Sequence, residues 1–427
     1  MKILNSNNVS FDRQLDQLLS IRKRKVQSSS APVTNIIKDV KKNGDKALLK
    51  YEKRFNKNSI IVPTSRQISK SIKSLDKEVK QAIDTAYNRI YKFHSLQKVK
   101  NISYTDKFKN KLEYKYLPIE SVAIYVPGST VSYPSSVLMN AIPAIVAGVK
   151  RIIMINPGFK GKQNPAVLYA ARKCKIREIY SIGGPSAIAA AAYGTKKIKQ
   201  VNKIVGPGNV YVAAAKKEVF GDVGIEGMTA GPSEVTVVCD KYSNPIWVAS
   251  DLISQAEHDL LAQCILISKD KRLIDKVKLE VFKQLKEIPR KLIARKSIMN
   301  NGILIHTNSD KKIIEVVNKI APEHLELNVK NYKLLVPKIK NAGSICLGKY
   351  AVMAMTDYNV GSNHVLPTNG SAKYSSGISV NEFYKRISYI NLSKKGIESL
   401  GPSVITLANY EGLAGHAQSI NKRIRRK

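Results

Sequence analysis

The hydrophobic and polar positions change their period near residue 120. Before it, residues 31–55 carry apolar side chains at helical spacing, interrupted at Asn43-Gly44-Asp45, which predicts two helices or a helix and a turn. After it, short and almost continuous apolar runs alternate with helical segments; the runs read SVAIYVPG, RIIMINPG, REIYSIGG and VNKIVGPG. Such alternation predicts a parallel β-sheet covered by helices on both faces.

The alternation of short apolar runs with helical segments continues beyond residue 232. GPSEVTVVCD, CILISKD and NGILIHTN read as further strands, and a helix begins at Asn244-Pro245, a good cap and first position. Residues 1–30 are polar and basic and predict an arm or short helices, and the last fifty residues predict an appended helical segment. The chain is therefore expected to be an α/β protein with small helical ends.

Three of the predicted strands end in glycine-rich turns that open directly into helices: VPGS, IGGPS and VGPGN. A small residue there lets a ligand approach the backbone, and the helix N-terminus offers free N–H groups and a positive dipole end. In open α/β sheets ligands bind beyond the carboxyl ends of the strands. The turns together favour a nucleotide or phosphate site, although no GxGxxG pattern follows any strand and each turn by itself is more readily explained as an ordinary βα turn.

The net charge of +39 allows two interpretations. One is a nucleic-acid or anionic-membrane surface, and the other is compositional drift that places lysine on every solvated face. Lysines extend from Lys2 to Lys427, and only residues 20–25 and 421–427 form dense clusters, without interleaved aromatic residues. The distribution favours drift, so we expect no nucleic-acid partner.

A membrane or secretory role is not expected either. The most apolar stretch, VLMNAIPAIVAGV, is interrupted by Asn140 and Pro143, and the N-terminus lacks an apolar signal region. The four cysteines are scattered without a CxxC pair. They predict small buried residues of a reduced, cytoplasmic protein.

Four of the six histidines lie close in sequence to carboxylate or amide side chains: His258 near Gln255, His324 beside Glu323, His364 near Asp357, and His416 near Glu411. Gln255 and His258 are expected to share one face of a helix, whereas Asp357 and His364 are expected on a loop. Each group alone has an ordinary structural explanation. Taken together, nitrogen and oxygen donors without cysteine suit Zn²⁺ or a similar divalent ion.

The stretch APEHLEL places Glu323 directly beside His324 in an otherwise apolar segment. An exposed polar pair at the end of a helix would explain it, and so would a proton-transfer pair. Nothing within the seven residues decides between the two interpretations.

Over most of its length the chain resembles the histidinol dehydrogenase family. The resemblance rests on YVPG, YPSSVLMNAIPA, KIVGPGNVYVAAAK, AGPSEV, DLISQAEHD, APEHLEL and DYNVGSNHVLPT, in the family's order and approximate spacing. It implies an NAD-dependent, zinc-containing enzyme that oxidises L-histidinol through L-histidinal to L-histidine, the last step of histidine biosynthesis. One Zn²⁺ per subunit is expected to orient the substrate.

The resemblance also implies roles for particular residues. The zinc ligands fall on Gln255, His258, Asp357 and His416, and the acid/base pair falls on Glu323 and His324. The substrate site would add Ser233, His364 and Glu411 to these side chains. NAD contacts fall on Tyr125, Asn209 and position 186, where Ser186 replaces the family's common glutamine; Ser129 likewise replaces a common glycine.

The implied architecture is an intertwined homodimer of two Rossmann-like, doubly wound domains. The expected division is an N-terminal arm (1–25), a first domain (26–120 plus 235–377), a second domain (121–234) and a C-terminal dimerisation segment (378–427). Glu411 and His416 would then serve the active site of the partner subunit. Two rival classes stay open: a zinc hydrolase without a cofactor, and a nucleic-acid-binding protein.

Overall fold

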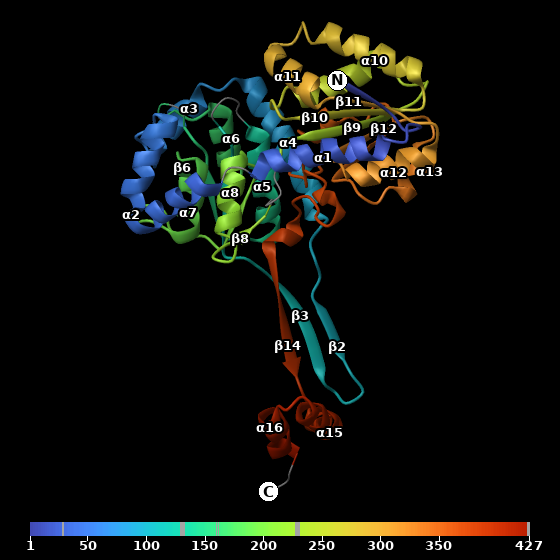
Figure 1. The fold of residues 1–427 in the computed structure, drawn as a ribbon. Helices are drawn as coiled ribbons and strands as arrows, with labels where there is room; N and C mark the ends of the chain where they lie inside the picture. The colour runs from blue at the N-terminus through green and yellow to red at the C-terminus, as the bar shows by residue number, and fades with distance from the viewer. Residues whose placement is uncertain (28–29, 129–132, 159, 161, 227–230, 425–427) are drawn as a thin grey trace.

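The computed structural model describes residues 1–27, 30–128, 133–158, 160, 162–226 and 231–424. Two lobes, each built on a parallel β-sheet, lie side by side, and a narrow stalk projects from them (Figure 1). The expected α/β class with parallel sheets is confirmed. In the described part of the chain, no helix is long and apolar enough to cross a membrane.

The six-stranded sheet has the order β1-β11-β10-β9-β12-β13 and is parallel throughout. Its strands are β1 (Lys2–Asn5), β9 (Glu234–Cys239), β10 (Gln263–Ser268), β11 (Ile303–His306), β12 (His324–Asn328) and β13 (Ser344–Leu347). One face packs against α1 (Phe11–Gln27), α12 (Asp310–Ile320), α13 (Tyr332–Leu335) and the 3₁₀ turn η1 (Val336–Lys338). The other packs against α9 (Pro245–Ala256), α10 (Lys271–Gln284), α11 (Lys291–Asn301) and the short α14 (Met353–Thr356).

The five-stranded sheet has the order β6-β5-β4-β7-β8, also parallel. Its strands are β4 (Ser121–Tyr125), β5 (Arg151–Ile155), β6 (Glu178–Tyr180), β7 (Lys203–Val205) and β8 (Gly224–Ile225). The chain winds outward from β4 to β6 and then returns to β7, so the topological switch point lies between β4 and β7. Ligands of such sheets bind in the crevice at that point.

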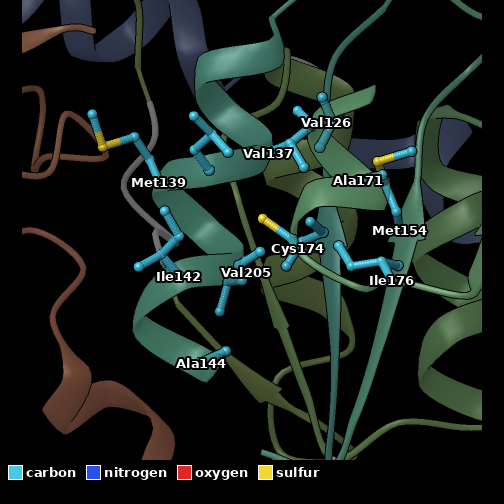
Figure 2. Close-up of a cluster of buried hydrophobic side chains, with 14 of the residues drawn as sticks. Val126, Val137, Met139, Ile142, Ala144, Met154, Ala171, Cys174, Ile176 and Val205 are labelled. Atoms are coloured by element: carbon cyan, nitrogen blue, oxygen red, sulfur yellow. The ribbon is translucent and has the colours of Figure 1, made fainter. Parts of the chain in front are cut away.

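Helices cover both faces of the five-stranded sheet. One face carries α3 (Ser65–Lys73), α4 (Lys77–Ser95), α5 (Pro134–Ala147) and α6 (Pro165–Lys173), and the other carries α2 (Ser30–Asn56), α7 (Gly184–Tyr193) and α8 (Val210–Glu218). Figure 2 shows the first of these cores, in which Val137 of α5 lies beside Val126, the residue after β4, and Ile142 of α5 lies beside Val205 of β7. The expected interruption at Asn43-Gly44-Asp45 is a kink in α2, where Gly44 has φ 51°.

The expected domain division differs from the packing. Residues 26–120 were assigned to the domain of 235–377, but α2, α3 and α4 share the cores of the five-stranded sheet. The expected arm, residues 1–25, contributes β1, which pairs with β11 at the edge of the six-stranded sheet. The periodicity of the sequence shows which face of a helix such as α2 is apolar, but it does not show which element that face packs against. Here α2 packs against the alanine-rich α7, whose small side chains allow the two helices to approach closely.

The stalk consists of a three-stranded antiparallel sheet that ends in two helices (Figure 1). Its elements are β2 (Ile102–Thr105), β3 (Lys111–Pro118), β14 (Tyr384–Asn391), α15 (Lys394–Tyr410) and α16 (Ala414–Ile424), with η2 (Ser371–Lys373) and η3 (Val380–Phe383) leading into β14. The C-terminal segment was expected to be helical, so β14 was missed. Its residues are almost all exposed, and only pairing with β3 over eight residues makes it a strand.

Candidate functional site

The acid/base pair lies at the start of β12, inside the protein. Helix α12 ends at Ile320, Ala321 turns the chain with φ 49°, and Glu323 and His324 are 7% and 3% exposed. Glu323 Oε2 accepts a hydrogen bond from the backbone N–H of Glu234, at the start of the neighbouring strand β9, at 2.7 Å. An exposed polar pair at a helix end is therefore the wrong interpretation of this stretch.

His324 is held as a neutral base. Its Nε2 lies 3.8 Å from Asp357 Oδ1 and 4.0 Å from Glu323 Oε1. Burial, followed by the charges of His364 and His258, lowers the pKa of His324 to about 3. Its Nδ1 is buried without a hydrogen-bond partner among the described residues. A neutral imidazole in this position can accept a proton from a bound molecule.

The loop after α14 brings two further predicted residues to the same place. Asp357 caps the C-terminal end of α14, and burial raises its pKa to about 6, an effect that His258 opposes. His364 Nδ1 lies 2.8 Å from the backbone oxygen of Asp357 and 4.0 Å from its Oδ1, while Ser136 Oγ of α5 lies 3.5 Å from His364 Nε2. Ser136, which belongs to the other lobe, was not among the predicted site residues, although it lies within the motif YPSSVLMNAIPA.

Gln255 and His258 lie beside this cluster. They were expected to share one helix, but only Gln255 is helical. Helix α9 ends at Ala256, and His258 follows in a turn, its N–H bonded to the Gln255 carbonyl at 3.2 Å. Asp259 Oδ1 accepts from Leu261 N at 2.8 Å, a side-chain turn that competes with helix continuation. Burial lowers the pKa of His258, opposed by the charge of Asp357.

The buried side chain of Gln255 is suited to binding a ligand from outside the chain. It is 1% exposed, and both its Oε1 and Nε2 are buried without a partner in the described part of the chain. Because buried amides are rarely left without hydrogen bonds, this pair of atoms calls for a binding partner. Gln255, His258 and Asp357 offer the oxygen and nitrogen donors that Zn²⁺ accepts, although within the described ranges no three His, Cys, Asp or Glu side chains group as a metal site.

His416 and Glu411 are not brought to this cluster within one chain. His416 lies on α16 and Glu411 caps α15, and both are exposed at the far end of the stalk (Figure 1). Ser233 lies immediately before β9, where its carbonyl accepts from Gln263 N at 2.9 Å, so it adjoins the Glu234 N–H that binds Glu323.

The residues assigned to NAD lie at the carboxyl edge of the five-stranded sheet. Tyr125 ends β4, is buried, and its hydroxyl oxygen accepts from Gly184 N at 3.1 Å. Ser186 in α7 is buried and donates to the Gly183 carbonyl at 3.1 Å. Asn209 is exposed and caps α8, accepting from Tyr211 N and Val212 N. Ser129 lies outside the described residues.

At two of the three glycine turns, protein groups take some of the N–H groups that were expected to be free for a ligand. At α7, Gly183 N donates to Glu52 Oε1 at 2.8 Å and Gly184 N donates to Tyr125. At α8, the Asn209 side chain accepts hydrogen bonds from the N–H groups of Tyr211 and Val212. Glu52 was missed because an acid within the charged run of α2 looks solvated, yet it is 1% exposed, and burial raises its pKa to about 7.

Tyr125→Phe should lower the free energy of unfolding by about 1–3 kcal/mol, because Gly184 N would lose its buried acceptor. Chemical denaturation would measure this. Tyr193→Phe is the matched control, since its hydroxyl bonds Asp222 at an exposed position. Equal stability of the Tyr125→Phe variant and the parent would show that this hydrogen bond is not needed.

Comparison with known proteins assigns the chain to a family. The model of the family described as histidinol dehydrogenase matches residues 19–424. The chain is 80% identical, over the whole of both chains, to a histidinol dehydrogenase of Pelagibacter ubique, and 44% identical to one of Nitrosomonas europaea over 98% of both. The crystal structure of histidinol dehydrogenase from Elizabethkingia anophelis is 36% identical, with a TM-score of 0.91, covering 99% of this chain and 98% of that one. Together with the buried cluster at β12 and α9, these likenesses show that the chain belongs to the histidinol dehydrogenase family.

Proposed function

We propose that the chain oxidises L-histidinol through L-histidinal to L-histidine, with Zn²⁺ in the site and NAD⁺ as the electron acceptor. The observation that carries the proposal is the buried grouping of His324, Glu323 and Asp357 beside the unpartnered amide of Gln255. This grouping brings a neutral base, two carboxylates and an amide without a partner among the described residues together on or beside the neighbouring elements α9, β12 and α14 of the family's fold. The proposal includes a cytoplasmic location, as for other soluble biosynthetic enzymes.

His324 accepts the proton of the substrate alcohol while hydride leaves its carbon for NAD⁺, which gives the aldehyde and NADH. Glu323 removes a proton from the water that adds to the aldehyde, while His324 returns its proton to the former carbonyl oxygen, so the hydrate forms and His324 is neutral again. The hydrate then loses a second hydride to a second NAD⁺, and His324 again takes the hydroxyl proton. Zn²⁺, when bound by Gln255, His258, Asp357 and the partner's tail, would supply a fixed point for the substrate's nitrogens and so orient it.

Three side chains at the edge of the five-stranded sheet would contact NAD: Tyr125, Ser186 and Asn209. The Tyr125 hydroxyl, whose oxygen accepts from Gly184 N, would donate a hydrogen bond to the cofactor. Asn209 is exposed beside the switch point of the sheet. Ser233, His364 and Glu411 would complete the substrate site.

The chain would act as an intertwined homodimer, with no nucleic-acid or membrane partner. Exposed apolar side chains on the stalk support this, since a free monomer would leave them in water: Leu112, Tyr114, Ile390, Leu400, Leu407, Tyr410 and Leu413. Helix α15, which Glu411 caps, and helix α16, which carries His416, lie at the end of that stalk, away from the six-stranded sheet of their own chain (Figure 1). The dimer would carry them to the site of the other subunit.

Purified protein should form NADH when mixed with L-histidinol and NAD⁺, and a zinc chelator should stop it. Absorbance at the NADH band follows the reaction. A zinc hydrolase would form no NADH, and its activity would not depend on NAD⁺. An absence of NADH formation by zinc-loaded protein would therefore overturn the proposal. A nucleic-acid-binding protein would instead give a salt-dependent gel shift at physiological ionic strength.

Glu323→Gln should slow oxidation of L-histidinal more than oxidation of L-histidinol. The amide keeps an oxygen for the Glu234 N–H but cannot take a proton from water. The two steps are measured separately, each supplied with its own substrate, and Glu315→Gln on the exposed surface of α12 serves as control. Oxidation of L-histidinal at the parent rate would remove Glu323 from the water-activating role.

A further inference from the structure

Two carboxyl groups lie directly behind the site, between α9 and β12. The carboxyl groups of Asp251 and Glu326 lie within reach of each other. Asp251 Oδ2 is buried and accepts no hydrogen bond from a fixed donor in the part of the chain that the structure describes, so a proton held between the two groups would satisfy it. Asp251 is four residues before Gln255 on α9, and Glu326 is two residues after His324 on β12. These spacings keep each pair of side chains on one face of its element. Helix and strand thus each present one site residue and one carboxyl group to the space between them.

Glu326 also holds the element that carries Asp357. Its Oε1 accepts a hydrogen bond from the backbone N–H of Met353 at 2.7 Å, and Met353 is the first residue of α14. Asp357 caps the other end of this short helix. The two carboxyl groups therefore connect α9, β12 and α14, the three elements that supply Gln255, His324 and Asp357.

Glu326 is buried and Asp251 is half-buried. Two carboxyl groups in contact in such surroundings cannot both be ionised at low cost. Burial, followed by the charge of Asp251, raises the pKa of Glu326 to about 8, and burial raises that of Asp251 to about 6. The other ionisable groups that face the pair are Cys346, opposite Glu326 on β13, Asp357 beyond α14 and the neutral His324 on β12. Burial and the negative charges of the pair and of Asp357 raise the pKa of Cys346 to about 12, so it stays a thiol.

We propose that Asp251 and Glu326 form a positioning pair that shares one proton, and that this hydrogen bond fixes α14, and with it Asp357, against Gln255 and His324. Neither carboxyl group touches the substrate; they act through the residues that do. The inference rests on the proposed function for the identity of the site, but the pair itself can be tested without it.

The first test is zinc affinity, measured by competition with a chromophoric chelator. Glu326→Gln can still donate to Asp251 and accept from Met353 N, and Asp251→Asn can still donate to an ionised Glu326, so both should bind zinc within a few-fold of the parent. Glu326→Ala leaves both partners unsatisfied and should weaken zinc binding by roughly 10- to 100-fold, as loss of an outer-shell partner does. Glu315→Gln is the control for loss of a carboxylate. A folded Glu326→Ala variant with parent affinity, or a Glu326→Gln variant as weak as Glu326→Ala, would overturn the proposal.

The second test uses metal-free protein and needs no activity. A carboxyl group whose pKa is raised in the folded state binds more protons folded than unfolded, so the stability it contributes is present at low pH and is lost as the pH rises. For the pair, the loss should run between about pH 4.5 and about pH 8. Glu326→Gln cannot lose this proton. The difference between its melting temperature and that of the parent should therefore shift in favour of Glu326→Gln as the pH rises from 5 to 8.5. A constant difference over this range would show that no proton is shared.

The two hypotheses fail separately. If the parent neither binds zinc nor forms NADH, the proposed function falls, while the pH dependence of the metal-free protein still decides whether the pair shares a proton. If the parent is active but the melting difference is flat, only the positioning pair falls.

Discussion

His324→Asn should lower kcat for L-histidinol oxidation by roughly 10²- to 10⁴-fold, the usual contribution of general acid/base catalysis. Asparagine can fill part of the space but cannot accept a proton at neutral pH. His364 and His258 lie nearby, but His364 already contacts the Asp357 backbone oxygen, and His258 belongs to the proposed zinc site. No neighbouring imidazole is therefore placed to take over.

The measurement is steady-state NADH formation, with zinc content determined for each preparation. His306→Asn is the matched control, because His306 ends β11 of the same sheet and makes only a 3.2 Å contact with the Lys269 backbone oxygen. Zinc content should stay at the parent level in both variants. A folded, zinc-loaded His324→Asn enzyme that turns over within a few-fold of the parent would exclude His324 as the base.

The second large effect concerns the stalk. His416→Ala and His258→Ala should each lose zinc and nearly all activity while remaining folded, because loss of one ligand leaves the ion incompletely coordinated. If His416 serves the partner's site, a mixture of the two variants should regain activity once subunits exchange. Random pairing makes about half of the dimers mixed, each with one intact site, so recovery should approach about a quarter of parent activity.

The control mixes His416→Ala with a Gln255→Ala/His416→Ala double variant. In that mixture no subunit carries an intact His416, so no pairing can complete a site. Subunit exchange is followed independently with two differently tagged chains. If exchange is complete and the first mixture remains inactive, His416 does not act across the interface.

The local pattern of the sequence predicted much of the fold. Continuous apolar runs predicted parallel strands, and Asn244-Pro245 predicted the start of α9, as the structure confirms. These features are local, since strand burial and helix capping depend on a few neighbouring residues. The exposed strand β14 lacked such a signal, because its pairing with β3 joins segments more than 260 residues apart in the sequence.

For the site, the sequence determined which side chains are present: histidines beside carboxylates and amides, without cysteine. Only the tertiary structure decided that Glu323 and His324 are buried, that Asp357 reaches His324, and that His258 leaves the helix. It also decided that Glu52 and Glu326 are buried and that Asp251 is half-buried, so that none of the three is a freely solvated acid. The physical reason is that burial and contacts between charged groups are made by segments that are distant in the chain. The residues next to a carboxyl group in the sequence therefore do not show whether water or another carboxyl group surrounds it in the folded protein.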